Sequence, residues 1–442
     1  MDSSVLIAWF AVFIDFLSVF IVSPVLTPLA LQYDATATQV TLLFSIALGS
    51  NIISSFAFGK ARDTFKRTKP LILLSFAGST TCLGLMPMAN SYGVLVGIRC
   101  CGGFFSGTMV LSQSYIARNS PPENRARYMA VCTAMVPLAV IFGPALGGGL
   151  YSVGGLRLPF FVASSLGAIG FTAALVLFKD DPPTPTVPAA PKQDDAKVEE
   201  KSAPPAARPS EALMREHAPL IRLVTLCGYL HYFAMMTFQS LGLYFMQVEY
   251  GTDPVQFSLV QTMGGIAATA CQTLGFIKVS PSIGKHTCEV IGIAVTALGY
   301  SVMALAGSLQ VFLVGVGLIF SGSGFGIPAI TTLLARYSTP SRMGAVLGSG
   351  QACMGLGRFI GSFAAGPLYT VAPRLPFAVA AAMAAATSAL MMLTLHLNRQ
   401  LPEKTKAVMR ETKVTAAELF DETFRGSVVA SKASGSHEST MV

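Results

Sequence analysis

Several short segments in the first half of this chain recur in the second half at a nearly constant distance. Three pairs are separated by 217 or 218 residues: 117–125 with 335–342, 150–153 with 368–371, and 157–160 with 374–377. The residues between the copies are strongly apolar. A duplicated bundle of membrane helices explains both observations. Two parallel halves that face each other are typical of proteins that carry solutes across membranes.

The composition excludes an ordinary soluble domain. Charged residues make up 12% of the 442 residues and hydrophobic residues 52%, whereas about a quarter of the residues of a soluble domain are charged. A soluble fold of this length could not bury so much apolar surface, so we expect a lipid bilayer around it. The formal charge of +8 does not indicate a nucleic-acid partner, because the Lys and Arg residues gather in particular loops.

The sequence carries no motif for a cofactor or for enzymatic chemistry. Its eight cysteines lie mostly in apolar runs, where they are typical of small core residues. No His, Cys, Asp and Glu cluster has the spacing of metal ligands, and no phosphate-binding Gly-Lys-Ser/Thr loop occurs. We therefore predict no cofactor, no metal, no catalytic residues and no ATP-driven pumping.

Twelve apolar runs are long enough to cross a bilayer, which takes about 20 residues. They are numbered as spans 1 to 12: 5–31, 39–60, 70–90, 93–117, 128–152, 157–178, 221–246, 255–278, 286–307, 309–335, 343–372 and 375–397. The first run is not a cleaved signal peptide, because it lacks a basic leader and contains Asp15. The predicted fold is an all-α membrane protein with twelve transmembrane helices in two pseudo-symmetric halves of six.

The domain organisation follows from these runs. The predicted parts are an N-terminal half, a cytoplasmic linker, a C-terminal half and a cytoplasmic tail: 1–178, 179–220, 221–397 and 398–442. The linker is rich in Pro, Ala and charged residues and cannot bury a core, although its end at 210–217 favours a short surface helix. In the tail, 416–424 favours an amphipathic helix, and 440–442 fits a carboxylate-capture motif.

The basic residues of the loops predict the orientation. Lys and Arg gather after spans 2, 4, 8, 10 and 12, whereas the loops after odd-numbered spans hold only Arg157 and Arg374. Because basic loops remain on the cytoplasmic side, both termini are expected in the cytoplasm. The spans do not distinguish the plasma membrane from an organelle membrane.

The loop between spans 2 and 3 carries a family pattern. Residues 59–69 read GKARDTFKRTK. This resembles the Gly-x-x-x-Asp-Arg/Lys-x-Gly-Arg-Arg/Lys loop of the major facilitator superfamily, in particular its drug/proton antiporter branch, which is similar to tetracycline transporters. The matching residues are Gly59, Asp63 and Arg67, and the departures are Thr64, Lys66 and Thr68. The resemblance implies that Asp63 braces the cytoplasmic ends of the two halves. A basic loop that only fixes the orientation is the alternative.

Span 5 carries a second pattern of this family. Its matching residues within GPALGG are Gly143, Pro144, Gly147 and Gly148, and the pattern is similar to the Gly-Pro-x-x-Gly-Gly motif of antiporters. Proline removes a helix hydrogen bond and glycine lets a neighbouring helix approach closely. We therefore expect a kinked, tightly packed helix that seals one side of the cavity.

Two charged residues inside the spans are candidates for a proton and substrate site. Arg99 lies in an Arg-x-x-x-Gly motif of span 4 that resembles the family's, and Asp15 lies in span 1. A charge inside a span costs roughly 2.5–3.5 kcal/mol, so it needs a partner or water. With a rise of about 1.5 Å per residue, the two lie within roughly 5 Å of the same depth. We expect them to pair, with Asp15 carrying the proton and Arg99 adjusting its proton affinity; a static ion pair is the alternative.

The second half offers further candidates. His231 lies at or beside the repeat position of Asp15, and histidine titrates near neutral pH; a packing role is the alternative. Arg358 in span 11 resembles an arginine of related transporters and is a candidate for binding an anionic group. Gln239 and Gln351 are polar residues of spans 7 and 11.

Together these features predict a secondary transporter that alternates access between its two halves. The prediction is a functional monomer that exchanges a small organic molecule for protons, for efflux of drugs and organic ions or for loading an organelle. The surplus of buried cations also permits an organic anion. Two alternatives remain open: a metabolite importer or uniporter of the same fold, and a transporter-like sensor that does not transport. The sequence identifies neither substrate nor direction.

Overall fold

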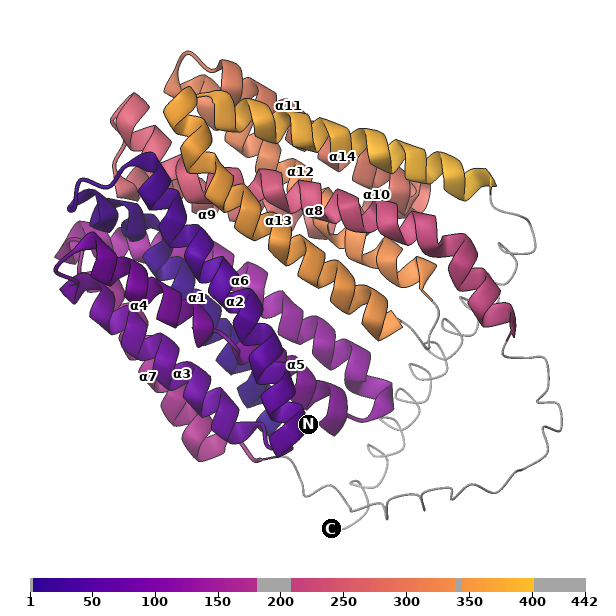
Figure 1. Cartoon of the computed structure of the whole chain (residues 1–442), viewed down its shortest axis with the longest axis horizontal. Coiled ribbons are helices and arrows are strands. Elements are labelled where there is room, and N and C mark those ends of the chain that lie inside the picture. Colours follow the sequence, from indigo (N-terminus) through magenta and orange to yellow (C-terminus); the bar gives the residue numbers. More distant parts are fainter. Residues whose placement is uncertain (1–2, 181–207, 339–342, 401–442) are drawn as a thin grey trace, which may run out of the picture.

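A computed structural model of the chain describes residues 3–180, 208–338 and 343–400 (Figure 1). Every regular element in these residues is a helix. Most of the expected linker, and the tail with its segments 416–424 and 440–442, lie outside the described residues.

Each predicted span corresponds to one helical segment. In the first half these are α1 (Ser3–Leu31), α2 (Ala37–Phe65), α3 (Lys69–Leu85) with the 3-10 turn Met86–Met88, α4 (Tyr92–Phe104) with α5 (Thr108–Asn119), α6 (Pro122–Gly154) and α7 (Leu158–Leu177). In the second half they are α8 (Arg208–Tyr250), α9 (Pro254–Ala270) with the π-helix Cys271–Phe276 and α10 (Ile277–Ile283), α11 (Lys285–Leu305), α12 (Leu309–Tyr337), α13 (Met343–Val371) and α14 (Leu375–Gln400).

Ten segments among the described residues are long and apolar enough to cross a membrane by length and composition; the two others are α9–α10 and α13. Two details were not predicted. Spans 4 and 8 are interrupted, the first by a break and the second by a π-helix. The helix expected at 210–217 is continuous with span 7, because α8 runs without interruption from Arg208 to Tyr250.

The helices form two bundles, α1–α7 and α8–α14, each with its own apolar core (Figure 1). In each bundle the first span packs against the fifth, α1 on α6 and α8 on α13. Glycines make both approaches close. A Cβ atom at Gly143 or Gly147 would overlap α1, and one at Gly357 or Gly361 would overlap backbone atoms of α8. The duplicated sequence has therefore kept the same helix packing in both halves.

The two bundles meet mainly through α2 with α13 and α6 with α9. The close contacts lie far from the end that holds residues 60–69 and the start of α11, which we name the basic end. At the opposite, far end, Gly366 packs against Thr41, the Ser362 hydroxyl donates to the Thr41 carbonyl at 3.4 Å, and Gly148 packs against Ser258.

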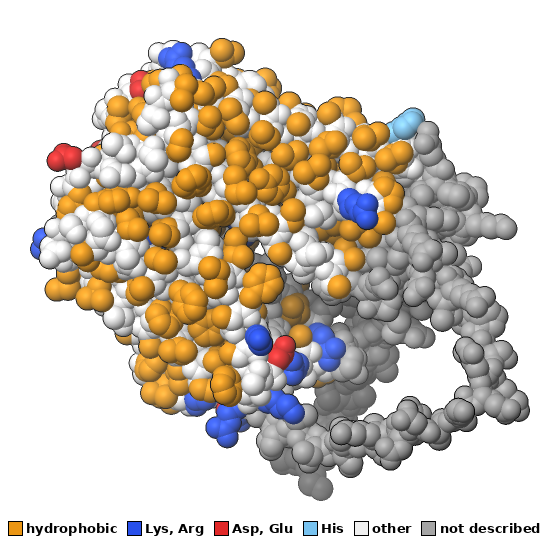
Figure 2. Space-filling view, viewed as in Figure 1, with side chains coloured by type: hydrophobic (Ala, Val, Ile, Leu, Met, Phe, Trp, Pro, Cys, Tyr) orange, Lys and Arg blue, Asp and Glu red, His pale blue; other side chains and the backbone are white. Residues whose placement is uncertain are grey.

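The surface is hollowed between the bundles toward the end where Lys and Arg side chains gather (Figure 2). No described hydrogen bond or ion pair joins the bundles at that end. Within the described residues, the two bundles are therefore in contact at the far end and separated by a hollow at the basic end, an arrangement called the open state below.

The far-end contact can be tested with a single methyl group. A Cβ at residue 366 would lie 2.5 Å from Thr38 Cα, so we expect Gly366→Ala to push α13 away from α2. Spin labels at the exposed far-end residues Asn90 and Gly307 should then show a longer distance by double electron–electron resonance.

The matched control is Gly348→Ala on the same helix, where nothing lies within 4 Å of the added Cβ. An unchanged Asn90–Gly307 distance in Gly366→Ala would contradict the assigned far-end contact.

Candidate functional site at the break of span 4

The break between α4 and α5 exposes backbone groups inside the bundle. Residues 105–107 leave the helical ladder, and side chains of two neighbouring helices bind them. Asn51 Nδ2 donates to the Ser106 carbonyl at 2.8 Å. Ser75 Oγ donates to the Phe105 carbonyl at 2.5 Å and accepts the Gly107 N–H at 3.0 Å. Because lipid offers no hydrogen bonds, an irregular segment at this depth needs such partners.

Asp15 of α1 is connected to this break through two hydroxyl groups. Its carboxyl group interacts with the Thr108 side chain, and Thr108 Oγ1 lies 3.0 Å from Ser75 Oγ. All three side chains are buried. Thr108 is the first residue of α5, so the carboxyl group lies at a helix N-terminus, where backbone N–H groups favour a negative charge. These residues, Asp15, Thr108 and Ser75, are referred to below as the polar chain.

The polar chain can respond to a proton. Ionised Asp15 only accepts hydrogen bonds, so a Thr108 hydroxyl that turns toward it acts as the donor. Protonated Asp15 can donate to Thr108, whose own proton is then free to turn toward Ser75. Ser75 holds the backbone of the break directly. A proton on Asp15 can therefore change whether Thr108 donates to Asp15 or to Ser75, the side chain that binds the break.

In the second half, the three residues at the equivalent positions also lie together, but none of them carries a hydroxyl group. His231, Gly326 and Ile293 follow Asp15, Thr108 and Ser75 by 216, 218 and 218 residues. A Cβ at Gly326 would lie 3.5 Å from His231 Cε1 and 3.4 Å from Ile293 Cγ1. His231 is fully buried, and neither ring nitrogen has a hydrogen-bond partner among the described residues. The duplication thus left a polar chain in one half and an unpartnered histidine in the other.

The expected pair between Asp15 and Arg99 is not formed. Arg99 Nε donates instead to the Leu43 carbonyl of α2 at 3.4 Å, and no ion pair joins Arg99 to Asp15 within the described helices. Asp15 lies 12 residues from the start of α1, and Arg99 lies 20 residues from the end of α5. At about 1.5 Å per residue this is a difference in depth of roughly 12 Å. The prediction was wrong because it placed Arg99 by its distance from the outer end of a core of about 30 Å, whereas the segment Tyr92–Asn119 has 28 residues and is roughly 42 Å long.

The other polar candidates lie apart from the polar chain. The Arg358 guanidinium lies 4.1 Å from the centre of the Tyr232 ring on α8, a cation–π contact. Gln239 is half-buried on α8, and Gln351 is exposed on α13. No described hydrogen bond or ion pair connects Asp15 with His231 or Arg358. The structure thus brings Asp15 to residues that the sequence reasoning missed, and leaves its expected partners elsewhere.

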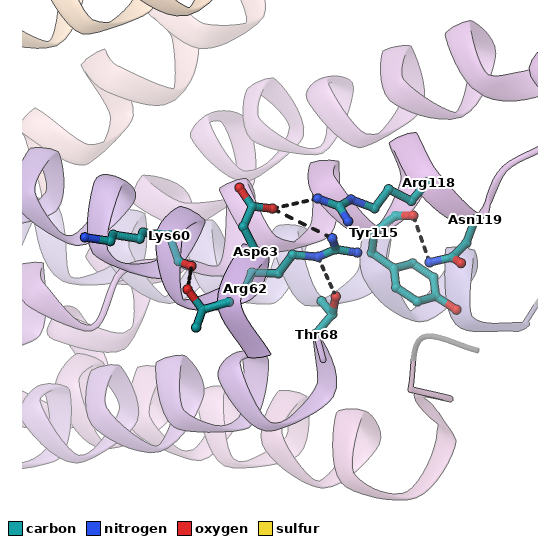
Figure 3. A network of polar contacts seen from close by, with 8 residues as sticks. Lys60, Arg62, Asp63, Thr68, Tyr115, Arg118 and Asn119 are labelled. Carbon is teal, nitrogen blue, oxygen red and sulfur yellow. Dashed lines mark hydrogen bonds and ion pairs between the residues drawn. The ribbon is translucent and has the colours of Figure 1, made fainter. Parts of the chain in front are cut away.

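The loop after α2 forms its own network (Figure 3). Asp63 Oδ1 accepts from Arg118 Nη2 at 2.6 Å, which ties α2 to the end of α5. Both side chains are more than half exposed. The buried Arg62 donates from Nε to Thr68 Oγ1 at 3.3 Å, and Arg67 Nε lies 3.9 Å from Asp180. In this open state Asp63 therefore binds a residue of its own half.

Two family patterns adopt definite backbone geometry. Lys66 departs from the family's glycine, yet it ends α2 in the left-handed region with φ 54°, so the turn is kept at the cost of about 1 kcal/mol. A Cβ at Gly59 would meet no atom within 4 Å. Pro144 lies inside α6, which continues to Gly154. Gly143 and Gly147 face α1, whereas Gly148 faces Ser258 of the other bundle.

Removing the Ser75 hydroxyl should loosen the break. We expect Ser75→Ala to destabilise the protein by about 1 kcal/mol, because it removes the side-chain partner of the Phe105 carbonyl and the Gly107 N–H and leaves these two groups only the hydrogen bond they make to each other. Thermal unfolding of the purified protein measures the loss. Ser79→Ala is the control one turn along α3, since that hydroxyl binds only its own helix, at the Phe76 carbonyl. Equal stability of the two variants would contradict the assigned role.

A hydroxyl at Gly326 should restore the missing partner in the second half. The atoms nearest to a Cβ at residue 326 lie at ordinary van der Waals distances, so Gly326→Ser should place a hydroxyl beside His231 without a clash. We expect it to exceed Gly326→Ala in stability by about 0.5–1.5 kcal/mol, although alanine is the better helix former. Thermal unfolding of the two variants compares them directly, and a more stable alanine variant would speak against the equivalence.

Known proteins match this chain along most of its length. A family model described as Major Facilitator Superfamily matches residues 8–241 and 224–433. The quinolone resistance protein NorA of Staphylococcus aureus (strain Mu50) is 25% identical over 421 residues, which cover 91% of this chain and all of that protein. Multidrug resistance protein 2 of Bacillus subtilis is 24% identical over 375 residues, 83% of this chain and 88% of that protein.

Two solved structures share the fold. The human organic anion transporter MFSD10 superposes with a TM-score of 0.61 and 18% identity, over 89% of this chain and 98% of that one. A bacterial homolog of the human lysosomal transporter Spinster, in an inward-facing and unoccupied conformation, superposes with a TM-score of 0.63 and 15% identity, over 95% and 97% of the two chains.

Proposed function

Because this chain belongs to the major facilitator superfamily, whose members are transporters and not enzymes, we propose that it moves a small organic molecule across its membrane in exchange for protons. The observation that carries this proposal is the polar chain, which joins the buried Asp15 to the break of span 4. The quinolone and multidrug resistance proteins among its relatives support efflux of drug-like molecules as the direction and substrate class.

The proposed cycle alternates between two closures. With the basic loops in the cytoplasm, as charge distribution favours, both termini lie inside and the open basic end faces the cytoplasm. The substrate enters there and binds between the halves, where Arg358, Gln239 and Gln351 are candidate polar contacts. Asp63 and Arg118 move with α2 and α5 when the basic ends close. The far-end contacts of Gly366 and Gly148 then separate and release the substrate outside or into an organelle.

Asp15 couples this cycle to protons. A proton taken up from the outer side neutralises the carboxylate at the start of α5 and reverses the Thr108 hydroxyl. This shifts the hydrogen bonds that Ser75 makes to the break and favours the return to the state open at the basic end. Release of the proton into the cytoplasm returns the polar chain to its ionised state. Each half supplies its own six spans, so a monomer in the bilayer suffices.

An organic anion is the second substrate candidate. Arg99 and Arg358 both lie within spans, and neither has a carboxylate partner among the described residues. A metabolite importer and a non-transporting sensor would share the same fold. The direction of transport distinguishes an importer from an exporter, and the occurrence of transport distinguishes both from a sensor. Uptake driven by an inward proton gradient would favour the importer, and the absence of any substrate movement would favour the sensor.

Asp15→Asn should uncouple transport from protons. The amide keeps the shape of the side chain but cannot exchange a proton, so we expect quinolone movement driven by a pH step in proteoliposomes to fall at least about tenfold, or about 1.4 kcal/mol in activation free energy. Asp34→Asn is the control, because Asp34 is exposed in a turn with φ 53°, which asparagine adopts readily. Wild-type transport by Asp15→Asn would remove the proposed coupling.

A further inference from the structure

The second half contains a buried acid that the polar chain does not involve. Glu289 lies on α11, and its side chain is fully buried. Neither carboxylate oxygen has a hydrogen-bond partner among the described residues. An unpaired carboxylate in an apolar interior costs several kcal/mol, and such a group takes up a proton instead. A proton on Glu289 would remove this cost.

The groups that face Glu289 come from every helix packed around it. Cys227 of α8 and Tyr337 of α12 lie close enough to interact with it electrostatically. From α14, the Ser388 hydroxyl donates at 3.5 Å to the carbonyl of Val290, the next residue along α11. On α10, Lys278 is exposed. No described cation pairs with Glu289.

A base lies one helical turn farther into the bundle. Ile293 follows Glu289 by four residues on α11, and His231 follows Cys227 by four residues on α8. Ile293 and His231 meet at Gly326 of α12. The two unpartnered groups, Glu289 and His231, are therefore separated by about one turn, or about 5.4 Å along the helix axes. A protonated carboxyl group is a donor and a neutral imidazole nitrogen is an acceptor.

A thin lid separates Glu289 from the basic end. Glu289 follows Lys285, the first residue of α11, by four residues, so about 6 Å of helix lies between Glu289 and the start of α11. Tyr337 is the last residue of α12 and is fully buried. Its carbonyl lies 3.1 Å from His217 Nδ1, and the two rings pack edge to face at 5.8 Å. Movement of the end of α12 would expose the carboxyl group to the basic end.

We propose that Glu289 is a second proton-binding site, which exchanges its proton at the basic end past Tyr337 and shares it with His231. In the sharing step the O–H bond of Glu289 breaks and an N–H bond forms on His231, leaving a carboxylate and an imidazolium. The site rests on the proposed proton exchange for its role in transport. Each half then binds one proton, on Asp15 in the first and on Glu289 in the second.

Infrared difference spectroscopy tests the site without a substrate. Spectra of the protein in lipid vesicles, taken between acid and alkaline pH, report the C=O stretch of each protonated carboxyl group that titrates. We expect one such band to be lost in Glu289→Gln and kept in Asp15→Asn. Asp34→Asn is the control for an exposed carboxylate. Persistence of every titrating band in Glu289→Gln would overturn the proposal.

Transport measurements then assign the role of the site. With a quinolone as the probe, the number of protons exchanged per molecule, obtained from the pH gradient that balances a quinolone gradient, should fall by one in Glu289→Gln. An unchanged ratio would also overturn the proposal. If the wild-type protein shows no pH-driven movement at all, the proposed function fails while the infrared result still decides whether Glu289 titrates.

Isotope labelling of the wild-type protein keeps the test valid if Glu289→Gln does not fold. Incorporation of carbon-13 glutamate into the wild-type protein shifts glutamate carboxyl bands and leaves aspartate bands in place. A titrating band that shifts with labelled glutamate supports the site, and a spectrum without one contradicts it. Because Glu289 is the glutamate that is buried without a partner in the described residues, slow hydrogen–deuterium exchange of its band in heavy water distinguishes it from exposed glutamates.

Discussion

The absence of water inside a bilayer governs the organisation of this molecule. Three backbone residues that leave the helix at the break of span 4 must find hydrogen bonds from protein, and Asn51 and Ser75 provide them. This requirement draws α2, α3 and α5 together at one point. The same hydroxyl that stabilises the break is linked through Thr108 to Asp15. A structural necessity of the membrane therefore connects an ionisable group with a flexible joint.

The two halves show how a duplicated scaffold can divide its tasks. The first and fifth spans pack through glycines in both halves, so the backbone arrangement has been kept. The polar content has not. Asp15, Thr108 and Ser75 correspond to His231, Gly326 and Ile293. The buried acid of the second half, Glu289, lies on α11, one turn before Ile293. A glycine in place of Thr108 removes the partner that would otherwise hold His231 in one protonation state.

Sequence patterns predicted the helical segments well, because the thickness of a bilayer sets the length of the apolar runs. The twelve helical segments lie where the apolar runs place them, and the repeat offset located His231 beside the equivalent of Asp15. The break of span 4 was not predicted, because residues 102–107, GGFFSG, are as apolar as the residues of a continuous membrane helix. Arg99 was assigned to the wrong partner because its depth was counted from the outer end of a core of about 30 Å, whereas the segment that carries it has 28 residues and is longer than that core. Glu289 was overlooked because it directly follows the polar start of span 9.

The far-end contact between α2 and α13 is made largely by glycine against backbone, with Gly366 against Thr38 and Thr41 and the Ser362 hydroxyl on a main-chain carbonyl. Around it, Leu241, Tyr244 and Tyr369 pack with Ala37 and Ala365. Because the closest approaches involve glycine and main-chain atoms, opening this end requires whole helices to move. Slow, strongly temperature-dependent turnover is the natural counterpart of that tightness.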